Sequence, residues 1–344
     1  MSDAFEFDYL VFIGRFQPFH QGHRHVVETA LHYAKQVIIL IGSANSPRTP
    51  KNPFTVSERT AMILGSFEPD DAARIRCIGI PDATYNDNKW LIGVQKAIAN
   101  ATATTSNASI AIIGHDKDES SYYLGLFPQY GSFMVDNYQG LSATPLRAAY
   151  FGDDAKARSD ASAVLTDTSR AFLDAFIHTT HYANLKREFD HIQSYQAAWR
   201  DAPYPPSFIT ADAIVVQSGH ILLIERGGEY GRGLYALPGG FVDQGEDFYH
   251  ACVRELIEET SIDIDQAILK NSLITSQLFD APKRSARART VTMAYYFELP
   301  NSAELPQVRA ADDASHAFWL PLSQLDASQM FEDHYGMICR LLRI

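Results

Sequence analysis

Up to about residue 135, the chain alternates short apolar runs with stretches whose apolar residues recur three or four positions apart. The runs predict buried strands and the stretches predict amphipathic helices. We expect strands at residues 9–13, 36–41, 74–80, 109–113 and 132–135, and helices at 22–35, 56–66 and 88–100. Uniformly apolar strands alternating with helices predict an α/β fold with a doubly wound parallel sheet of Rossmann-like form. Such sheets bind ligands at the carboxyl ends of their strands.

The pattern becomes mainly helical beyond residue 143. Pro145 is expected at the first position of a helix capped by Thr144, and further helices are expected at 168–178 and 182–199. The segment Asp201-Ala-Pro-Tyr-Pro-Pro206 then interrupts every periodic pattern. We therefore expect a first domain over residues 1–200, with its helical part at 144–200. A Pro-rich linker over 201–207 and a second domain over 208–344 follow.

The second domain is rich in strand patterns. Apolar runs at 211–216 and 220–225 flank Gln217-Ser218-Gly219, which predicts a β-hairpin. A helix is expected at 247–260, strands at 272–278 and 290–299, and a last helix at 331–342. This order predicts an α+β domain.

Composition narrows the class of protein. A length of 344 residues suits two domains, and a hydrophobic content of 46% allows each a full core. The net charge of −12 argues against nucleic acid as a partner, although a nucleotide needs only a local basic pocket. The three cysteines show no CxxC spacing, so they predict neither a metal site nor a redox motif of that kind. No apolar run approaches the ~18 residues of a membrane span. The N-terminus lacks the basic region of a signal peptide. We expect a soluble, cytoplasmic protein that binds no membrane.

One stretch between the first strand and the first helix carries chemistry. It reads Gly14-Arg15-Phe16-Gln17-Pro18-Phe19-His20-Gln21-Gly22-His23. A strand, a turn and a helix start present backbone N–H groups and a positive dipole end to an anion. If the helix begins near Gln21, His20 and His23 share one face. With Arg15 they suit a polyphosphate; the alternative is a pair of surface or capping histidines.

A second stretch offers another anion cradle. It reads Leu141-Ser142-Ala143-Thr144-Pro145-Leu146-Arg147, with hydroxyls and backbone amides at a helix start and an arginine on its first turn. A plain helix cap explains this stretch equally well.

Together the two stretches resemble nucleotidyltransferases of the HxGH type. Their pattern GxFxPxHxGH matches residues 14–23, and their Ser/Thr-xx-Arg motif matches residues within 142–147. Residues 52–59 and 81–90 are similar to the archaeal-type nicotinamide mononucleotide (NMN) adenylyltransferases. The resemblance implies that ATP and NMN lie side by side and that the NMN phosphate attacks the α-phosphorus in line. Catalysis would then consist of positioning and charge stabilisation.

The resemblance also implies roles for single residues. His20, His23 and Arg147 would be catalytic and would contact the ATP triphosphate together with Arg15. The surrounding ATP-binding surface would be formed by Gly14, Phe16, Gly22, Ser142 and Thr144. For NMN it implies Trp90 stacked on the pyridine ring, Asn86 and Asp82 nearby, and Arg48 as a phosphate contact. Trp90 could equally be a core aromatic. Lys117 and Asp118, after the strand at 109–113, are candidates for adenine or ribose contacts. Thr55 and Ser57 are expected only to cap a helix, with Glu58 and Arg59 on its surface.

A second set of polar residues lies on the helix expected at 247–260. Glu255, Glu258 and Glu259 stand at i, i+3 and i+4, on one helix face. Adjacent carboxylates repel one another unless cations neutralise them, and oxygen-only ligands suit Mg²⁺ or Mn²⁺. Arg254 would orient one carboxylate, and Glu246 arrives from the preceding turn. Bound ions would bridge a pyrophosphate and activate a water. The alternative is an acidic, solvated helix face.

These residues resemble the Nudix signature, G-x5-E-x7-R-E-U-x-E-E-x-G-U. The matching positions are Gly240, Glu246, Arg254, Glu255, Leu256, Glu258, Glu259 and Ile262. Ser261 replaces the signature glycine, which costs roughly 1 kcal/mol if this helix end is left-handed. No metal ligand is changed by this departure.

Two segments are similar to ADP-ribose pyrophosphatases. They are residues 235–242 and the loop at 279–292, whose cations are Lys283, Arg284, Arg287 and Arg289. The resemblance implies that Arg284, Arg287 and Arg289, with Gly240, contact the substrate. No catalytic base outside the signature is assignable; Glu304, Asp312 and Asp313 are the loop acids to test.

Both resemblances occur together in the bifunctional NMN adenylyltransferase/Nudix hydrolases. This family implies an enzyme that makes NAD⁺ and pyrophosphate from NMN and ATP, and that cleaves ADP-ribose to AMP and ribose 5-phosphate. Two alternatives stay open. One is a regulator that senses NAD-derived ligands with a Nudix-like domain, and the other is an adenylyltransferase for a different phosphate acceptor. The sequence also leaves the oligomeric state open, a homo-oligomer included.

Overall fold

The computed structural model describes residues 5–114, 125–311 and 314–344. The chain forms two compact units, Met1–Lys186 and Arg187–Ile344. Their division falls inside helix α8 (Thr180–Ala198), so the last turns of this helix pack with the second unit. The domain boundary expected at the Pro-rich segment 201–207 stays a prediction.

The first unit is built on a five-stranded parallel sheet of order β3-β2-β1-β4-β5. Its strands are β1 (Phe7–Gly14), β2 (Ala34–Ile41), β3 (Ile75–Gly79), β4 (Ile110–Gly114) and β5 (Gly131–Met134). The predicted doubly wound sheet is confirmed. Because β1 lies between β2 and β4, the strand order reverses beside it, and the carboxyl end of β1 is the place where such sheets bind ligands.

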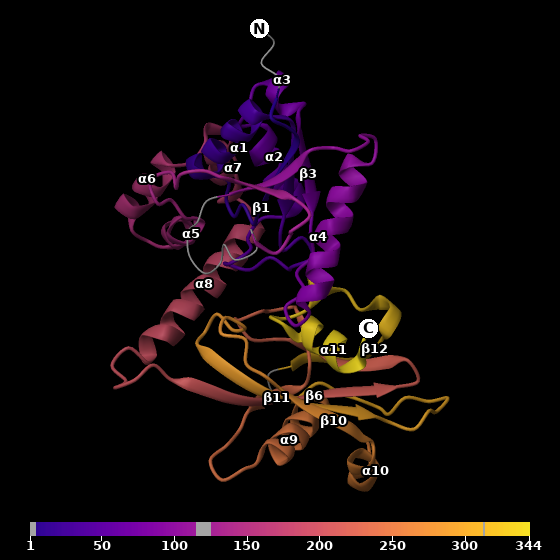
Figure 1. Cartoon of the computed structure of the whole chain (residues 1–344). Coiled ribbons are helices and arrows are strands. Elements are labelled where there is room, and N and C mark those ends of the chain that lie inside the picture. Colours follow the sequence, from indigo (N-terminus) through magenta and orange to yellow (C-terminus); the bar gives the residue numbers. More distant parts are fainter. Residues whose placement is uncertain (1–4, 115–124, 312–313) are drawn as a thin grey trace. The chain divides into compact units, whose positions relative to one another are not determined.

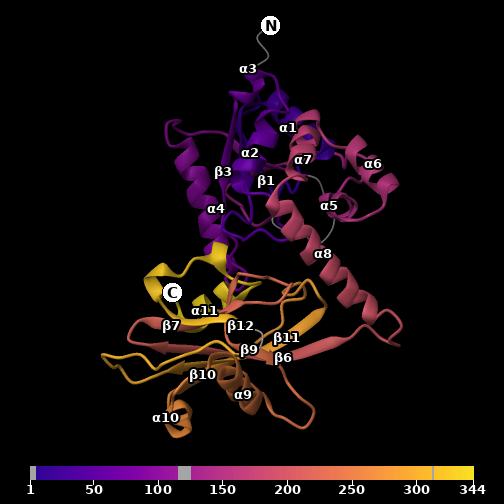
Figure 2. The same cartoon turned by 180° about the vertical axis from the view of Figure 1, so that it is seen from behind.

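Helices connect and flank this sheet (Figures 1 and 2). They are α1 (Gln21–Tyr33), α2 (Val56–Leu64), α3 (Pro69–Ala72), α4 (Asp87–Thr102), α5 (Ala143–Phe151), α6 (Ala155–Ala163), α7 (Asp167–Phe176) and α8. The prediction for α5 was wrong in detail. Ser142 is its N-cap, and Pro145 stands in the third helical position. Proline is tolerated there because the first-turn N–H groups have no partner within the helix.

The second unit contains a mixed sheet of order β10-β11-β6-β7-β12, in which β11 and β6 are parallel. Its strands are β6 (Ser207–Gln217), β7 (His220–Arg226), β8 (Tyr235–Ala236), β9 (Gly239–Phe241), β10 (Leu273–Phe279), β11 (Arg289–Glu298) and β12 (Ala314–Pro321). The predicted hairpin joins β6 to β7, with Ser218 and Gly219 at positive φ. The short strand β8 pairs with β7, and β9 pairs with β6.

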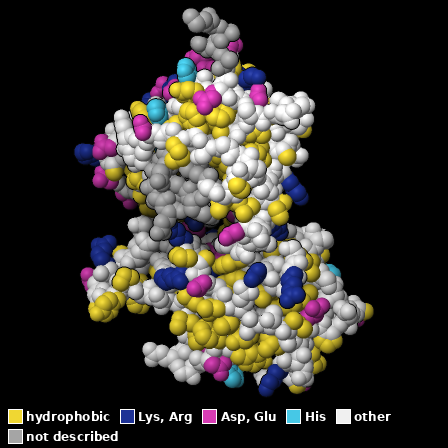
Figure 3. Space-filling model, viewed as in Figure 1, with side chains coloured by type: hydrophobic (Ala, Val, Ile, Leu, Met, Phe, Trp, Pro, Cys, Tyr) yellow, Lys and Arg dark blue, Asp and Glu magenta, His cyan; other side chains and the backbone are white. Residues whose placement is uncertain are grey.

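Three helices accompany this sheet: α9 (Phe248–Thr260), α10 (Gln266–Asn271) and α11 (His334–Leu342). Figures 1 and 2 show α9 and α11 on opposite sides of the sheet. The outer strand β10 leaves Leu273, Ile274 and Leu278 exposed. Figure 3 shows abundant hydrophobic side chains on the visible surface of this unit. Within the described residues, no helix has the length and apolar character that crossing a membrane requires.

Candidate functional site

The turn after β1 brings the two histidines together. Helix α1 begins at Gln21, and the His20 and His23 rings stack with their centroids 3.7 Å apart. His20 is the N-cap residue, yet its side chain makes no capping hydrogen bond to the described first turn. Gly14 leaves room for the Phe16 ring, because a Cβ atom would lie 2.8 Å from that ring and would force it to shift. The predicted shared face is confirmed, and the capping alternative does not account for His20.

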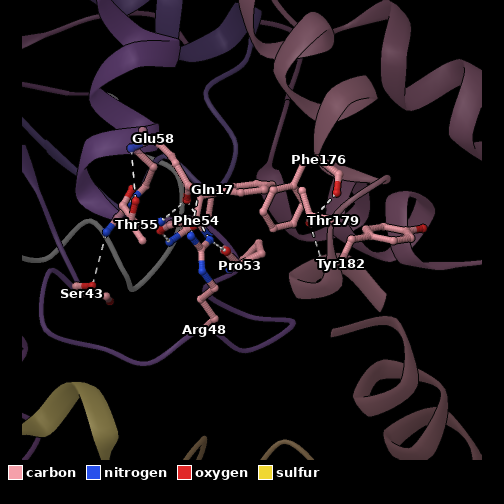
Figure 4. Close-up of polar contacts among 11 residues, drawn as sticks. Gln17, Ser43, Arg48, Pro53, Phe54, Thr55, Glu58, Phe176, Thr179 and Tyr182 are labelled. Atoms are coloured by element: carbon pink, nitrogen blue, oxygen red, sulfur yellow. Dashed lines mark hydrogen bonds and ion pairs between the residues drawn. The ribbon is translucent and has the colours of Figure 1, made fainter. Parts of the chain in front are cut away.

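A side-chain clamp fixes this turn to a second loop (Figure 4). The Gln17 amide donates to the Phe54 carbonyl and accepts from the Phe54 N–H, each at 3.0 Å. Arg147 of α5 donates from Nη1 to the Gln17 carbonyl at 2.7 Å. The two stretches singled out in the sequence, 14–23 and 141–147, therefore meet, although more than a hundred residues separate them.

Arg59 was expected on the surface of α2, and this prediction was wrong. Its side chain is almost fully buried, with 1% exposed. Nη1 donates to the carbonyls of Arg15 (2.8 Å) and Gly42 (2.7 Å), and Nη2 donates to that of Ser43 (3.4 Å). The sequence contained a signal, because Arg59 shares a helix face with the buried Met62 and Ile63.

Three arginines concentrate positive charge around the turn. Burial, together with repulsion from Arg15, lowers the pKa of Arg59 and of Arg147 to about 10, although the Asp82 charge opposes the shift at Arg59. Arg147 also donates to the Thr144 hydroxyl at 3.3 Å. Such a group of cations at a helix start is stabilised by a bound anion, and the stacked imidazoles lie on the same turn.

Arg48 is held by its own chain neighbours (Figure 4). Its guanidinium donates to both Glu58 oxygens at 2.8 Å and to the Pro53 carbonyl at 2.6 Å. Thr55 and Glu58 form the capping box of α2, which confirms Thr55 as a cap. Burial raises the pKa of Glu58, but the hydrogen bonds from Arg48 and from the Thr55 N–H outweigh it and hold that pKa below its ordinary value.

A pocket of about 290 Å³ lies beside the start of α4, and it is lined by Asp82, Ala83, Thr84, Asp87 and Trp90. Asp82 also accepts a hydrogen bond from the Ser43 N–H at 3.1 Å. Trp90 is half-buried, lies 6.1 Å from the Phe127 ring and packs against the core, so both interpretations of this residue hold in part. Asn86 caps α4 by accepting from the Lys89 N–H. Lys117 and Asp118 lie outside the described residues.

In the second unit, Arg254 gathers three carboxylates. It donates to Glu246 at 3.0 Å, to Glu255 at 2.8 Å and to Glu258 at 2.8 Å. The sequence predicted that Arg254 orients one carboxylate, and the structure shows it bound to three. Nη2 also donates to the Phe241 carbonyl at 3.0 Å, which ties the turn before α9 to the helix.

Glu259 completes the acidic face from a more buried position. It accepts a hydrogen bond from the Gly239 N–H at 2.9 Å. Burial raises the pKa of its carboxyl to about 8 with a contribution from the Glu255 charge, although the Gly239 hydrogen bond opposes this shift. A Cβ atom on Gly240 would collide with the Glu255 carboxylate, which explains the glycine. The donor set consists only of carboxylate oxygens, and these residues fit a hard divalent cation.

Ser261 adopts the left-handed conformation at the end of α9, with φ 42° and ψ 38°. Its N–H donates to the Ile257 carbonyl at 2.8 Å, so the helix still ends as the glycine of the signature would end it. Replacing the signature glycine with Ser261 therefore affects only the backbone conformation at this helix end.

The arginines of the loop at 283–289 have three different environments. Arg284, expected to contact substrate, is buried and donates to both Asp333 oxygens at 3.0 and 2.9 Å, which makes it part of the interior. Arg289 contacts Asp280. Arg287 lies against aromatic rings. The loop acid Glu304 is exposed, whereas Asp312 and Asp313 lie outside the described residues.

Sequence reasoning missed Asp212, a carboxylate inside the apolar run of β6. It is buried, accepts from the Thr292 hydroxyl at 2.5 Å and interacts with Glu259. Burial raises the pKa of Asp212 to about 6. A lone aspartate within an apolar strand is the signal that could have found it, because buried charges are rare without a partner.

Fold and sites define a two-unit nucleotide enzyme, a nucleotidyltransferase followed by a Nudix hydrolase. The cytidylyltransferase-like family matches residues 11–122, and the NUDIX domain family matches residues 206–341. The chain is 48% identical over 148 residues to the nicotinamide/nicotinic acid mononucleotide adenylyltransferase of Acinetobacter baylyi, covering 43% of this chain and 77% of that protein. It is 30% identical to the nicotinamide-nucleotide adenylyltransferase of Ignicoccus hospitalis, covering 39% of this chain and 78% of that protein.

The whole chain matches solved structures as well. A bifunctional NMN adenylyltransferase/ADP ribose pyrophosphatase from Francisella tularensis, complexed with AMP and a manganese ion, superposes with a TM-score of 0.88 at 35% identity. The match covers 98% of this chain and 99% of that one. This chain belongs to the family of bifunctional NMN adenylyltransferase/ADP-ribose pyrophosphatases. It is an enzyme of two activities that acts on nucleotides and uses a divalent metal.

Proposed function

We propose that the first unit transfers AMP from ATP to NMN, giving NAD⁺ and pyrophosphate. The observation that carries this is the meeting of the stacked His20 and His23 with Arg15 and Arg147 around one turn at the carboxyl end of β1. A triphosphate bound there would receive donors from both imidazoles and both guanidinium groups. Gly14, Gly22, Phe16, Ser142 and Thr144 would shape the surrounding ATP surface.

The transfer is a substitution at the α-phosphorus. An oxygen of the NMN phosphate forms a bond to that phosphorus, and the bond from the α-phosphorus to the bridging oxygen of pyrophosphate breaks. The cationic side chains stabilise the charge that develops on the leaving pyrophosphate, so no covalent enzyme intermediate is needed.

The pocket beside α4 is proposed to receive NMN. Trp90 offers a ring to stack on the pyridine, and Asp82 lines the same pocket. Asn86 stands at its helix start, whereas the donors of Arg48 are engaged by Glu58 and Pro53. We therefore propose that Arg48 mainly holds the loop at residues 48–58 in shape. It would contact the NMN phosphate only with guanidinium N–H groups that Glu58 and Pro53 do not use. A stacking tryptophan favours a pyridine nucleotide over another phosphate acceptor.

We propose that the second unit hydrolyses ADP-ribose to AMP and ribose 5-phosphate. Glu246, Glu255, Glu258 and Glu259 would hold Mg²⁺ or Mn²⁺. An ion held by these residues would supply charge neutralisation for the diphosphate and would make a water more acidic. Arg254 keeps three of these carboxylates in place, and the Gly239 N–H orients the fourth. A ligand-sensing regulator would not require this complete acidic face.

Product analysis tests both proposals. Purified protein with NMN, ATP and Mg²⁺ should form NAD⁺, and the same protein with ADP-ribose should form AMP. A panel containing nicotinate mononucleotide, flavin mononucleotide and phosphopantetheine checks the acceptor. Absence of NAD⁺ from the first reaction contradicts the transferase proposal.

We also propose that both reactions take place in the cytoplasm. We take residues 201–207 as the linker between the two catalytic domains.

A further inference from the structure

The connection from β8 to β9 is fixed at three consecutive residues. The Leu237 N–H donates to Nδ1 of the His334 ring at 3.0 Å. The Pro238 carbonyl accepts a hydrogen bond from the backbone of β6 at 2.8 Å. The Gly239 N–H donates to the Glu259 carboxylate at 2.9 Å. Because proline also fixes its own φ angle, a shift of Leu237 would be passed on to the Gly239 N–H.

His334 is kept neutral, as an acceptor at this position must be. It is the first residue of α11 and is buried, and a helix start disfavours a cation. Burial, followed by the charges of Arg284, Arg226 and Arg287, lowers the pKa of the ring well below its ordinary value. Since Nδ1 accepts from Leu237, the neutral ring carries its proton on Nε2.

The chain on the N-terminal side of His334 is anchored to its surroundings. The Phe331 N–H donates to the Tyr235 carbonyl at 2.8 Å, which ties the start of α11 to β8. Asp333 accepts from the Arg284 guanidinium at 3.0 and 2.9 Å, and both side chains are buried. The imidazole therefore stands on a fixed helix start, beside the segment whose N–H group it accepts.

Glu259 is oriented from this segment, whereas Arg254 donates to the other three carboxylates of the acidic face. Gly239 fits closely against β6, because a Cβ atom on it would meet the Ala211 carbonyl oxygen. A displaced Gly239 N–H would leave the buried Glu259 carboxylate without this donor. The orientation of Glu259 therefore depends on how the three-residue segment is held.

We propose that His334 is a positioning residue of the hydrolase unit, whose Nδ1 holds Leu237 so that the Gly239 N–H keeps Glu259 in its metal-binding orientation. This rests on the proposed function, because it takes Glu259 as a ligand of the divalent cation. Loss of a group that supports a metal ligand weakens metal binding or activity roughly 10- to 100-fold. His334 acts through the backbone of residues 237–239, so we expect the lower end of this range.

The test measures Mn²⁺ binding to the full-length protein without nucleotide, from the loss of the free ion's electron paramagnetic resonance signal. His334→Asn keeps an acceptor at the position of Nδ1, whereas His334→Gln carries its amide further along the side chain. We expect the Kd for Mn²⁺ to rise about tenfold in His334→Gln and to stay within about twofold of the wild type in His334→Asn. In His334→Gln, half-maximal ADP-ribose hydrolysis should need about tenfold more Mn²⁺, with the maximal rate within about twofold.

The matched control is His220→Gln, in the hairpin between β6 and β7, where the ring contacts the Ser218 carbonyl at 3.0 Å. It should change neither quantity. An unchanged Mn²⁺ Kd in His334→Gln, or an equal rise in His334→Asn, would overturn the positioning role. A lower maximal rate with unchanged Mn²⁺ dependence would also overturn it, because a loss of folded protein has this effect. If wild-type protein binds Mn²⁺ but leaves ADP-ribose intact, the proposed hydrolysis is wrong, and the Mn²⁺ titration still decides the role of His334.

Discussion

Arg59 shows how strongly the transferase site depends on one buried cation. Its guanidinium binds carbonyls from the turn after β1 and from the end of β2. Lysine carries the same charge but cannot donate in a fork to several acceptors. We expect Arg59→Lys to lower the free energy of unfolding by about 2 kcal/mol, measured by urea denaturation, and to reduce NAD⁺ synthesis.

The control for this change is Arg24→Lys, in an exposed pair with Glu28 on α1. It should change the free energy of unfolding by less than about 0.5 kcal/mol. An Arg59→Lys protein as stable as this control would show that the buried hydrogen bonds contribute little.

Gly240 allows a second prediction at the same scale. A Cβ atom at this position would overlap the Glu255 carboxylate, so a methyl group must displace this proposed metal ligand. We expect Gly240→Ala to reduce ADP-ribose hydrolysis at least about tenfold. Gly228→Ala is the matched control, because a Cβ there meets nothing within 4 Å. Equal hydrolysis rates in the two variants would contradict this account.

At the scale of elements, the end of α9 departs from the usual signature. Ser261 is left-handed, a conformation that costs a non-glycine residue about 1 kcal/mol. We therefore expect Ser261→Gly to raise the free energy of unfolding by about 0.5–1 kcal/mol without a change in hydrolysis rate. Thermal unfolding measures the first quantity, and destabilisation would argue against strain at this position.

The capping box of α2 makes a pH-dependent contribution. The pKa of Glu58 is below its ordinary value in the folded chain, so ionised Glu58 stabilises the fold at pH values above its unfolded pKa. This contribution is lost as the pH falls through the lowered, folded pKa. In Glu58→Gln, the difference in unfolding free energy between pH 7 and pH 3 should be smaller than in the wild type. An unchanged difference would show that Glu58 is not involved.

Elements with strong periodicity could be predicted, and others could not. The parallel strands and α9 follow from apolar runs and from helical spacing. Helix α6 buries none of its residues and β12 fully buries only Ala317, and neither element was predicted from the sequence. The sequence spacing also predicted that His20 and His23 share one face, because both lie on one helix turn. It could not reveal the pairing of Arg284 with Asp333, since only tertiary folding joins positions so far apart.

At the scale of the whole molecule, the chain carries two chemically distinct centres. One is a cluster of arginines and histidines at the carboxyl end of β1, and the other is a face of carboxylates on α9. The first suits the phosphates of ATP, and the second suits a divalent metal. Their reactions are related, because ADP-ribose arises when NAD⁺ is consumed.

The central claim is that each centre performs its own reaction. Glu258→Gln keeps the size of the side chain and removes one proposed metal-binding charge. Both activities are measured on this single variant. We predict that ADP-ribose hydrolysis falls more than about a hundredfold while NAD⁺ synthesis stays within about twofold of the wild type. Loss of both activities, or full retention of hydrolysis, would contradict the account.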